Sequence, residues 1–225
     1  VYCNKNCFGR TFRVKSPERI AEEFIKIKKL GFKEIHLTDD GFTTDIKRAK
    51  EICDLLIEKK VNINWSTITG IRVDRVDFEL LKKMKKAGCY RFYFGIESGN
   101  QNILNNIKKG IKLEQVRTAV FLSKKAGLEV AGYFMVGLPG ETEKTMQETI
   151  NLAKSLNLDL AKISITIPLP ATEMFDELDF RAMGITEDKK TGLQVAKCFA
   201  LSDYFIDSNE EAAFTDKLEN FLKKI

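Results

Sequence analysis

The stretch that decides the fold is Lys85-Lys86-Ala87-Gly88-Cys89-Tyr90-Arg91-Phe92-Tyr93-Phe94, in which a basic helix end is followed by a glycine and an aromatic strand. Lysines in a last helical turn suit the negative helix end, and a glycine just beyond can adopt the left-handed cap. Similar units recur at residues 28–37, 59–65, 124–134 and 154–167, with asparagine replacing glycine in the last and no glycine in the second. Strands that alternate with helices predict a parallel sheet with helical crossovers.

Nearly every predicted strand has an apolar and a polar face, and the strand near residue 130 is mixed. Successive side chains point to opposite faces, so Phe92 and Phe94 oppose Arg91 and Tyr93. A sheet covered by helices on both faces would be apolar on both. An ordinary eight-stranded barrel fills its interior with branched apolar side chains. We therefore expect an incompletely closed barrel with a polar lumen, the alternative being a one-sided sheet with solvent on its polar face. The expected substrate contacts in this lumen are His36, Asn64, Ser66, Tyr93, Lys162 and Thr166.

The composition is that of a globular domain. The 225 residues are 44% hydrophobic, which is enough for one sizeable core. No apolar run is long enough to span a membrane and no signal peptide is visible, so we expect a cytoplasmic protein without a membrane span. Five cysteines, an odd number, favour a reducing compartment over a disulfide framework. The net charge of +5 permits a nucleic-acid partner but does not indicate one, because acidic residues interrupt every basic stretch.

Acids, an arginine and glycine-rich turns follow the predicted strands. The carboxyl ends of the strands carry the functional residues in parallel barrels. The segments found there are Thr38-Asp39-Asp40-Gly41-Phe42-Thr43, Gly70-Ile71-Arg72-Val73-Asp74, Gly95-Ile96-Glu97-Ser98-Gly99 and Gly137-Leu138-Pro139-Gly140-Glu141-Thr142. These segments should therefore meet at one edge of the sheet.

Together with Cys3, Phe8-Gly9-Arg10 and Ser16-Pro17-Glu18, these segments resemble the radical S-adenosylmethionine superfamily, in particular its cobalamin-associated branch. The resemblance covers residues 1–173. It implies an α/β fold, a partial parallel (β/α) barrel over residues 1–174 whose first strand is missing or truncated. Residues 175–225 are expected to form a helical extension that packs on the barrel.

The resemblance gives Cys3 a role as a metal ligand. Members of this superfamily bind three irons of a [4Fe-4S] cluster through Cys-x-x-x-Cys-x-x-Cys and leave the fourth iron open for S-adenosylmethionine. The resemblance implies that Cys3 is the last of these ligands, that Tyr2 is the aromatic residue before it, and that the other two cysteines lie upstream of Val1. The alternative, with Cys3 and Cys7 as the first two ligands, fails because the third position is Arg10. We therefore expect this chain alone to be inactive.

Further roles are implied residue by residue. Asp39 and Asp40 would accept hydrogen bonds from a bound ammonium group. Glu97 and Ser98 would contact the ribose or methionine part of the cofactor, and Arg72 would hold the methionine carboxylate. The structural alternatives are turn or cap roles for the aspartates, strand-end capping for Glu97 and Ser98, and a surface ion pair with Asp74 for Arg72. The residues that match the adenine-covering fifth strand are Tyr133, Met135, Gly137 and Leu138.

The implied activity is radical chemistry. A reduced cluster would pass an electron to S-adenosylmethionine, giving methionine and a 5′-deoxyadenosyl radical that abstracts hydrogen from a small-molecule substrate. Cobalamin-dependent methyl transfer is an elaboration that the resemblance allows. The expected partner is an electron donor such as flavodoxin or ferredoxin. The alternatives are a radical enzyme that modifies transfer RNA, and a ligand-binding or scaffold barrel without a cluster.

Overall fold

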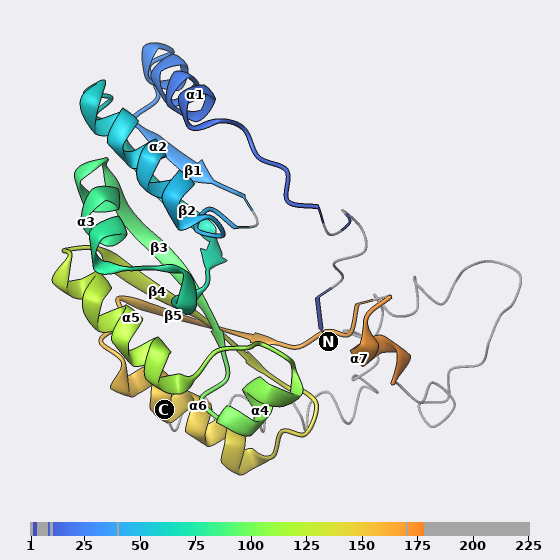
Figure 1. The fold of residues 1–225 in the computed structure, drawn as a ribbon. Helices are drawn as coiled ribbons and strands as arrows, with labels where there is room; N and C mark the ends of the chain where they lie inside the picture. Colours follow the sequence, from blue (N-terminus) through green and yellow to red (C-terminus); the bar gives the residue numbers. More distant parts are fainter. Residues whose placement is uncertain (1, 4–8, 10, 40, 170, 178–225) are drawn as a thin grey trace, which may run out of the picture. The chain divides into compact units, whose positions relative to one another are not determined.

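The computed structural model of the chain describes residues 2–3, 9, 11–39, 41–169 and 171–177 (Figure 1). The chain divides into two compact units, one of residues 12–166 and the other of residues 1–11 and 167–225. The second unit contains a single described helix, α7 (Glu173–Asp176). Most of the extension expected over residues 175–225 lies outside the described residues, and the boundary at residue 174 stays a prediction.

The larger unit contains one sheet of five parallel strands, arranged side by side in the order in which they occur in the sequence. This confirms the α/β fold with a parallel sheet that the repeated helix–strand units predict. The strands are β1 (Glu34–Leu37), β2 (Asn64–Ile71), β3 (Cys89–Glu97), β4 (Glu129–Val136) and β5 (Leu160–Ile165).

Helices connect the strands and lie along one face of the sheet (Figure 1). Each long helix begins at an extended cap residue; at α1, the Ser16 hydroxyl accepts the Arg19 N–H at 3.3 Å and Pro17 takes the first helical position. The helices of this unit are α1 (Pro17–Lys29), α2 (Ile46–Glu58), α3 (Phe78–Lys86), α4 (Gln101–Asn106), α5 (Leu113–Lys125) and α6 (Glu143–Ser155), with a 3₁₀ turn η1 (Val73–Arg75).

The core lies between the sheet and these helices, and Trp65 is its largest side chain. Its ring is fully buried and meets the rings of Phe24 and Phe42 edge-on, at centroid distances of 6.1 and 5.4 Å. The indole N–H donates to the Ala87 carbonyl at 2.9 Å, which satisfies a group that would otherwise be costly to bury. The apolar face predicted for strands β1 to β4 is therefore the face that the helices cover. Strand β5 differs, because it is exposed along its whole length and its Ile163 and Ile165 side chains are 37% and 50% exposed.

Strand β2 differs from the prediction at both ends. It begins at Asn64 rather than Val61, because Lys60 and Asn62 have φ values of 48° and 44°, which are incompatible with an extended strand. It also continues to Ile71 through an irregular segment, residues 68–70, where its register with β3 shifts. We call residues 68–70 the β2 bulge.

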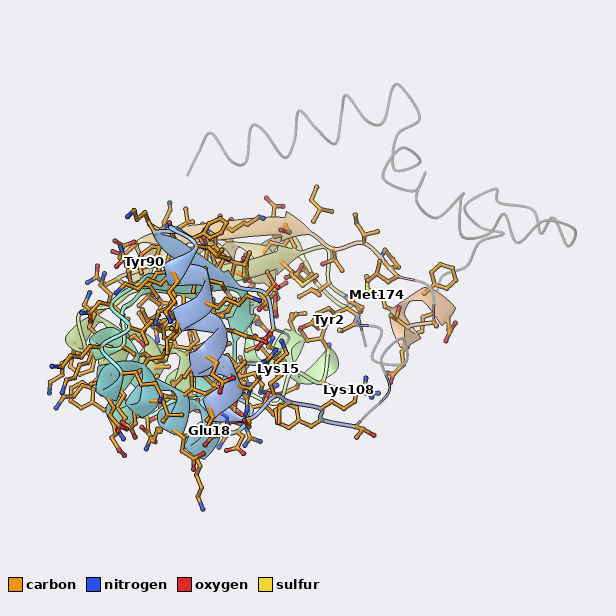
Figure 2. The ribbon with its side chains drawn as sticks, turned by 90° about the horizontal axis from the view of Figure 1, so that it is seen from above. Tyr2, Lys15, Glu18, Tyr90, Lys108 and Met174 are labelled. Atoms are coloured by element: carbon orange, nitrogen blue, oxygen red, sulfur yellow. The ribbon has the colours of Figure 1, made fainter. Side chains whose placement is uncertain are left out.

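The chain before α1 is tied to α2 by a buried arginine. The Arg48 guanidinium donates twice to the Lys15 carbonyl, at 3.1 and 2.9 Å, while the Lys15 ammonium pairs with Glu23 on α1. Lys15 and Glu18 lie at the start of that helix in Figure 2. These bonds fix the direction from which the chain enters α1.

Candidate active site at the carboxyl ends of the strands

The most enclosed charges at this edge are Glu97 and Lys109. Glu97 ends β3 with a φ of 71°, and its Oε1 lies 2.6 Å from the ammonium of Lys109, which follows α4. The two side chains are only 10% and 12% exposed. A Cβ at Gly95 would lie 2.9 Å from that carboxylate oxygen and 3.0 Å from the ammonium, so a larger residue there would require the ends of both side chains to shift. Sequence reasoning missed Lys109, although Lys108-Lys109-Gly110 marks the end of the short helix after Glu97.

Ser98 is engaged within the fold. Its buried hydroxyl lies 3.2 Å from the Thr149 hydroxyl on α6, and the Gly99 N–H donates to the same Thr149 oxygen at 2.9 Å. The next residue, Asn100, donates to Glu148 on α6 at 2.5 Å. These contacts clamp the turn after β3 to α6 and favour the capping role for Ser98.

Arg72 forms an ion pair with Asp74. This pair is the alternative to the predicted role of Arg72 in holding the methionine carboxylate of the cofactor. Its guanidinium makes two bonds to Asp74, at 2.9 and 3.0 Å, and donates to the Lys109 carbonyl at 3.1 Å. Burial raises the pKa of Asp74 and the Arg72 hydrogen bonds lower it, with a net shift downward. Arg72 therefore fixes the backbone of the residue whose side chain pairs with Glu97.

The acidic loop after β1 is held by β2. The Thr69 hydroxyl in the β2 bulge donates to the Asp39 carbonyl at 2.5 Å, and the Asp39 side chain is exposed. Asp40 lies outside the described residues. Three residues beyond Asp39, Phe42 is buried against Trp65. Anchors on both sides thus hold this loop beside the sheet edge.

Two tyrosines from neighbouring strands stack on the polar face of the sheet. The rings of Tyr93 and Tyr133 are 4.7 Å apart and nearly parallel, at 17°. The Lys162 ammonium lies 5.8 Å from the centre of the Tyr133 ring, and the Tyr133 hydroxyl donates to the Ile68 carbonyl at 2.5 Å. Burial, and secondarily Tyr93, raise the pKa of Tyr133. Tyr93, Tyr133 and Lys162 thus come together on one face of the sheet, and their contacts with cofactor or substrate stay predictions.

The loop after β4 leaves polar atoms without partners. The Leu138 N–H donates to Glu141 Oε2 at 3.0 Å, while Glu141 Oε1 is buried without a hydrogen bond to any described residue. Burial raises the pKa of Glu141. The buried Thr166 hydroxyl is likewise unpaired among the described residues, although its N–H bonds the Val136 carbonyl at 2.8 Å. Gly137 is exposed at this turn with a φ of 81°, and Met135 is half-buried just before it.

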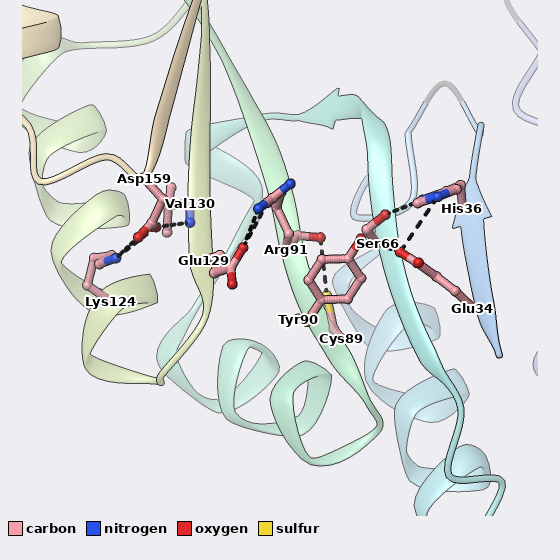
Figure 3. Close-up of polar contacts among 10 residues, drawn as sticks. All are labelled: Glu34, His36, Ser66, Cys89, Tyr90, Arg91, Lys124, Glu129, Val130 and Asp159. Carbon is pink, nitrogen blue, oxygen red and sulfur yellow. Dashed lines mark hydrogen bonds and ion pairs between the residues drawn. The ribbon is translucent and has the colours of Figure 1, made fainter.

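His36 and Ser66 belong to a polar cluster nearer the amino ends of the strands (Figure 3). His36 Nδ1 lies 2.7 Å from the buried Ser66 hydroxyl, and its Nε2 lies 3.6 Å from Glu34. The Tyr90 hydroxyl also bonds Glu34, and an Arg91–Glu129 pair joins β3 to β4 at 2.6 Å. His36 and Ser66 are thus apart from the Glu97–Lys109 pair along their strands. The remaining expected lumen residue, Asn64, is exposed at the first position of β2.

The N-terminal residues belong to the smaller unit. Cys3 is exposed and carries a free thiol. Within the described parts of the chain, no three His, Cys, Asp or Glu side chains group closely enough to hold a metal ion. No described helix is both long and apolar enough to cross a membrane.

Comparison with known proteins shows the family to which the chain belongs. Residues 1–153 match the family model described as the Radical SAM superfamily. The chain is 38% identical over 178 residues to an uncharacterized methyltransferase of Pyrococcus horikoshii, an alignment that covers 78% of this chain and 38% of the relative. It is 30% identical over 186 residues to the cytidylyl-2-hydroxyethylphosphonate methyltransferase of Streptomyces wedmorensis, covering 79% and 34%. The chain thus spans little more than a third of the length of these curated relatives.

Solved structures share the fold. The radical S-adenosylmethionine methyltransferase TsrM of Kitasatospora setae, solved with cobalamin and a [4Fe-4S] cluster, superposes with a TM-score of 0.63 at 19% identity. That match covers 67% of this chain and 31% of the other. Coproporphyrinogen III oxidase of Escherichia coli superposes with a TM-score of 0.54 at 15% identity, covering 84% and 44%. The described architecture is therefore that of a partial radical S-adenosylmethionine barrel.

Proposed function

Since the chain belongs to the radical S-adenosylmethionine superfamily, we propose that its strand-end site binds S-adenosylmethionine for a methyl-transferring radical enzyme. The observation that carries the proposal is the nearly buried Glu97–Lys109 pair beside Gly95. A fixed carboxylate and a fixed ammonium suit a ligand that carries both charges and hydroxyl groups, as the amino-acid and ribose parts of this cofactor do.

The residues present fit the organic cofactor. Buried polar atoms without partners are rare in folded proteins. Among the described residues, two such atoms are Glu141 Oε1 and the Thr166 hydroxyl, which lie at the ends of neighbouring strands. A bound nucleoside offers donors and acceptors that would satisfy them. The exposed carboxylate of Asp39, which follows β1, would accept a hydrogen bond from the ammonium of the methionine part.

The described residues do not by themselves fit a three-thiolate cluster. They provide one exposed thiol in the N-terminal segment, that of Cys3. In the superfamily, the cluster supplies the electron that cleaves S-adenosylmethionine. This chain's own residues would bind the cofactor, orient it over the polar face and exclude water from it.

The relatives support methyl transfer as the reaction of the intact protein. Two of them are named methyltransferases, and TsrM binds cobalamin. We propose a small-molecule substrate, a cobalamin-binding region in the intact protein, and an electron donor such as flavodoxin or ferredoxin. The free buried thiols of Cys53 and Cys89 support a reducing, cytoplasmic location.

The test is binding of radiolabelled S-adenosylmethionine to the 225-residue chain by equilibrium dialysis. Glu97→Gln keeps the size of the side chain but removes the charge. Since it leaves Lys109 without its partner, its folded fraction is first matched to the parent's by circular dichroism, and the folded variant should then bind about tenfold more weakly. The matched control is Glu114→Gln, an exposed carboxylate on α5. Equal affinity of the parent chain and Glu97→Gln would contradict the assignment of the site. In the intact reduced protein, the same variant should slow the formation of 5′-deoxyadenosine.

A further inference from the structure

The β2 bulge touches two parts of the candidate site that are far apart in the sequence. On one side, Ile68 accepts the hydrogen bond of the Tyr133 hydroxyl from β4 at 2.5 Å. On the other, the adjacent Thr69 donates to the Asp39 carbonyl after β1 at 2.5 Å. The bulge is therefore bonded both to β4 and to the segment after β1.

Tyr133 reaches the bulge by crossing β3. Its ring stacks on Tyr93, and a Cβ at Gly70 would lie 3.5 Å from the Tyr133 ring. Gly70 has a φ of 89°, a conformation that glycine adopts at no steric penalty. The Tyr133 ring thus lies within van der Waals reach of the bulge, and the positive φ explains the glycine at this position.

We propose that Thr69 and Tyr133 are positioning residues that hold the Asp39 loop in place for the cofactor. Neither hydroxyl needs to touch the cofactor. Tyr133 fixes the Ile68 carbonyl, the bulge fixes the Thr69 hydroxyl, and Thr69 fixes the Asp39 backbone. The inference that this arrangement serves S-adenosylmethionine rests on the proposed function. The coupling of Tyr133 to the Asp39 backbone through the β2 bulge does not depend on that function.

The first measurement is hydrogen–deuterium exchange of the loop amides in the 225-residue chain, read chiefly at Thr44, whose N–H donates to the Gly41 carbonyl at 3.1 Å. Thr69→Val is isosteric and removes the hydroxyl, and it should speed exchange in the loop about fivefold. Thr69→Ser retains the hydroxyl and should restore the parent rate. Tyr133→Phe should speed the same amides less than Thr69→Val, because it acts through the bulge. In the double variant, the change in the free energy of exchange should be smaller than the sum of the changes in the two single variants. The reason is that both substitutions break the same chain of hydrogen bonds.

Matched controls separate coupling from general loosening. Thr118→Val removes an exposed hydroxyl on α5, and Tyr90→Phe removes a tyrosine hydroxyl that bonds Glu34 near the amino ends of the strands. Both should leave the loop at the parent rate. Unchanged exchange in Thr69→Val, or the same acceleration in Thr118→Val, would overturn the coupling.

Dialysis with S-adenosylmethionine then separates the two proposals. If the parent binds, Thr69→Val should bind about fivefold more weakly and Thr69→Ser like the parent. Faster loop exchange with unchanged affinity would overturn the positioning role. If the parent chain does not bind, the proposed function of this chain's site fails, and the exchange rates alone decide the coupling.

Discussion

The Lys109 ammonium lies 2.6 Å from the Glu97 carboxylate, and the two side chains are held together from different segments at one end of the sheet. An ion pair that is nearly removed from water is harmful to break, because the remaining charge loses its partner. Lys109→Met should therefore destabilise the chain by about 3 kcal/mol in urea unfolding.

A second variant tests whether the unpaired charge is the cause. Glu97→Gln combined with Lys109→Met removes both charges, and it should recover much of the lost stability. Lys154→Met, at an exposed lysine on α6, is the matched control and should leave the unfolding midpoint in place. A double variant as unstable as Lys109→Met alone would contradict this account.

Trp65→Phe should destabilise the fold by about 2 kcal/mol, because it leaves the Ala87 carbonyl without its donor and creates a small cavity. Trp65 is the only tryptophan, so unfolding should be followed by far-ultraviolet circular dichroism instead of intrinsic fluorescence. Phe121→Leu, at an exposed aromatic side chain on α5, should have little effect. A loss as large for Phe121→Leu would show that the measurement does not report on the core.

Glu141 predicts a specific dependence of stability on pH. Burial raises its folded-state pKa above its ordinary value of 4.5. Between these two pKa values the folded state binds more protons than the unfolded state. The contribution of Glu141 is therefore fully present below the unfolded pKa and is lost as pH rises through the folded pKa. Glu141→Gln should flatten this decline in urea unfolding measured from pH 4 to pH 8.

The control for this pH series is Glu51→Gln, an exposed carboxylate in the middle of α2, which should keep the parent's pH dependence. The amide of Glu141→Gln can still accept the Leu138 N–H, so the turn after β4 should remain intact. A parallel decline in parent and Glu141→Gln would assign the pH dependence to another group.

The described cysteines should differ sharply in reactivity. Burial raises the pKa of Cys53 to about 12 and that of Cys89 well above its ordinary value, while Cys3 is exposed. Because the thiolate is the reactive form, iodoacetamide at pH 8 should label Cys3 and spare Cys53 and Cys89 until urea is added. Peptide mass spectrometry reads this out. Labelling of Cys53 in the folded chain would contradict its burial in the core.

Local patterns predicted the elements of this fold well, because these elements depend on nearby residues. The glycine after Lys85-Lys86-Ala87, the cap at Ser16 and the alternation through Phe92 and Phe94 are all short-range signals. The β2 bulge was missed because it depends on a tyrosine that is more than sixty residues away. Polar segments such as residues 66–71 look like loop in the sequence, although most of them continue the strand.

The candidate site was predictable in its outline but not in its pairings. The carboxyl ends of parallel strands bring Glu97 and the Asp39 loop to the same edge. The partners of Arg72 and Ser98 depend on how η1 and α6 pack, and no periodic pattern encodes this packing. The His36–Ser66 contact follows directly from the register, in which these two residues face each other.

The strand order has a consequence for how the chain acquires its structure. Each strand pairs with the one synthesised just before it, so the sheet can grow from one edge, one unit at a time. Pairing between sequence neighbours makes each loop closure shorter than pairing between distant strands would. A ribosome-bound chain could therefore add each helix and strand to an existing template as it emerges, and the growing edge would be the segment most in need of a chaperone until the next strand arrives.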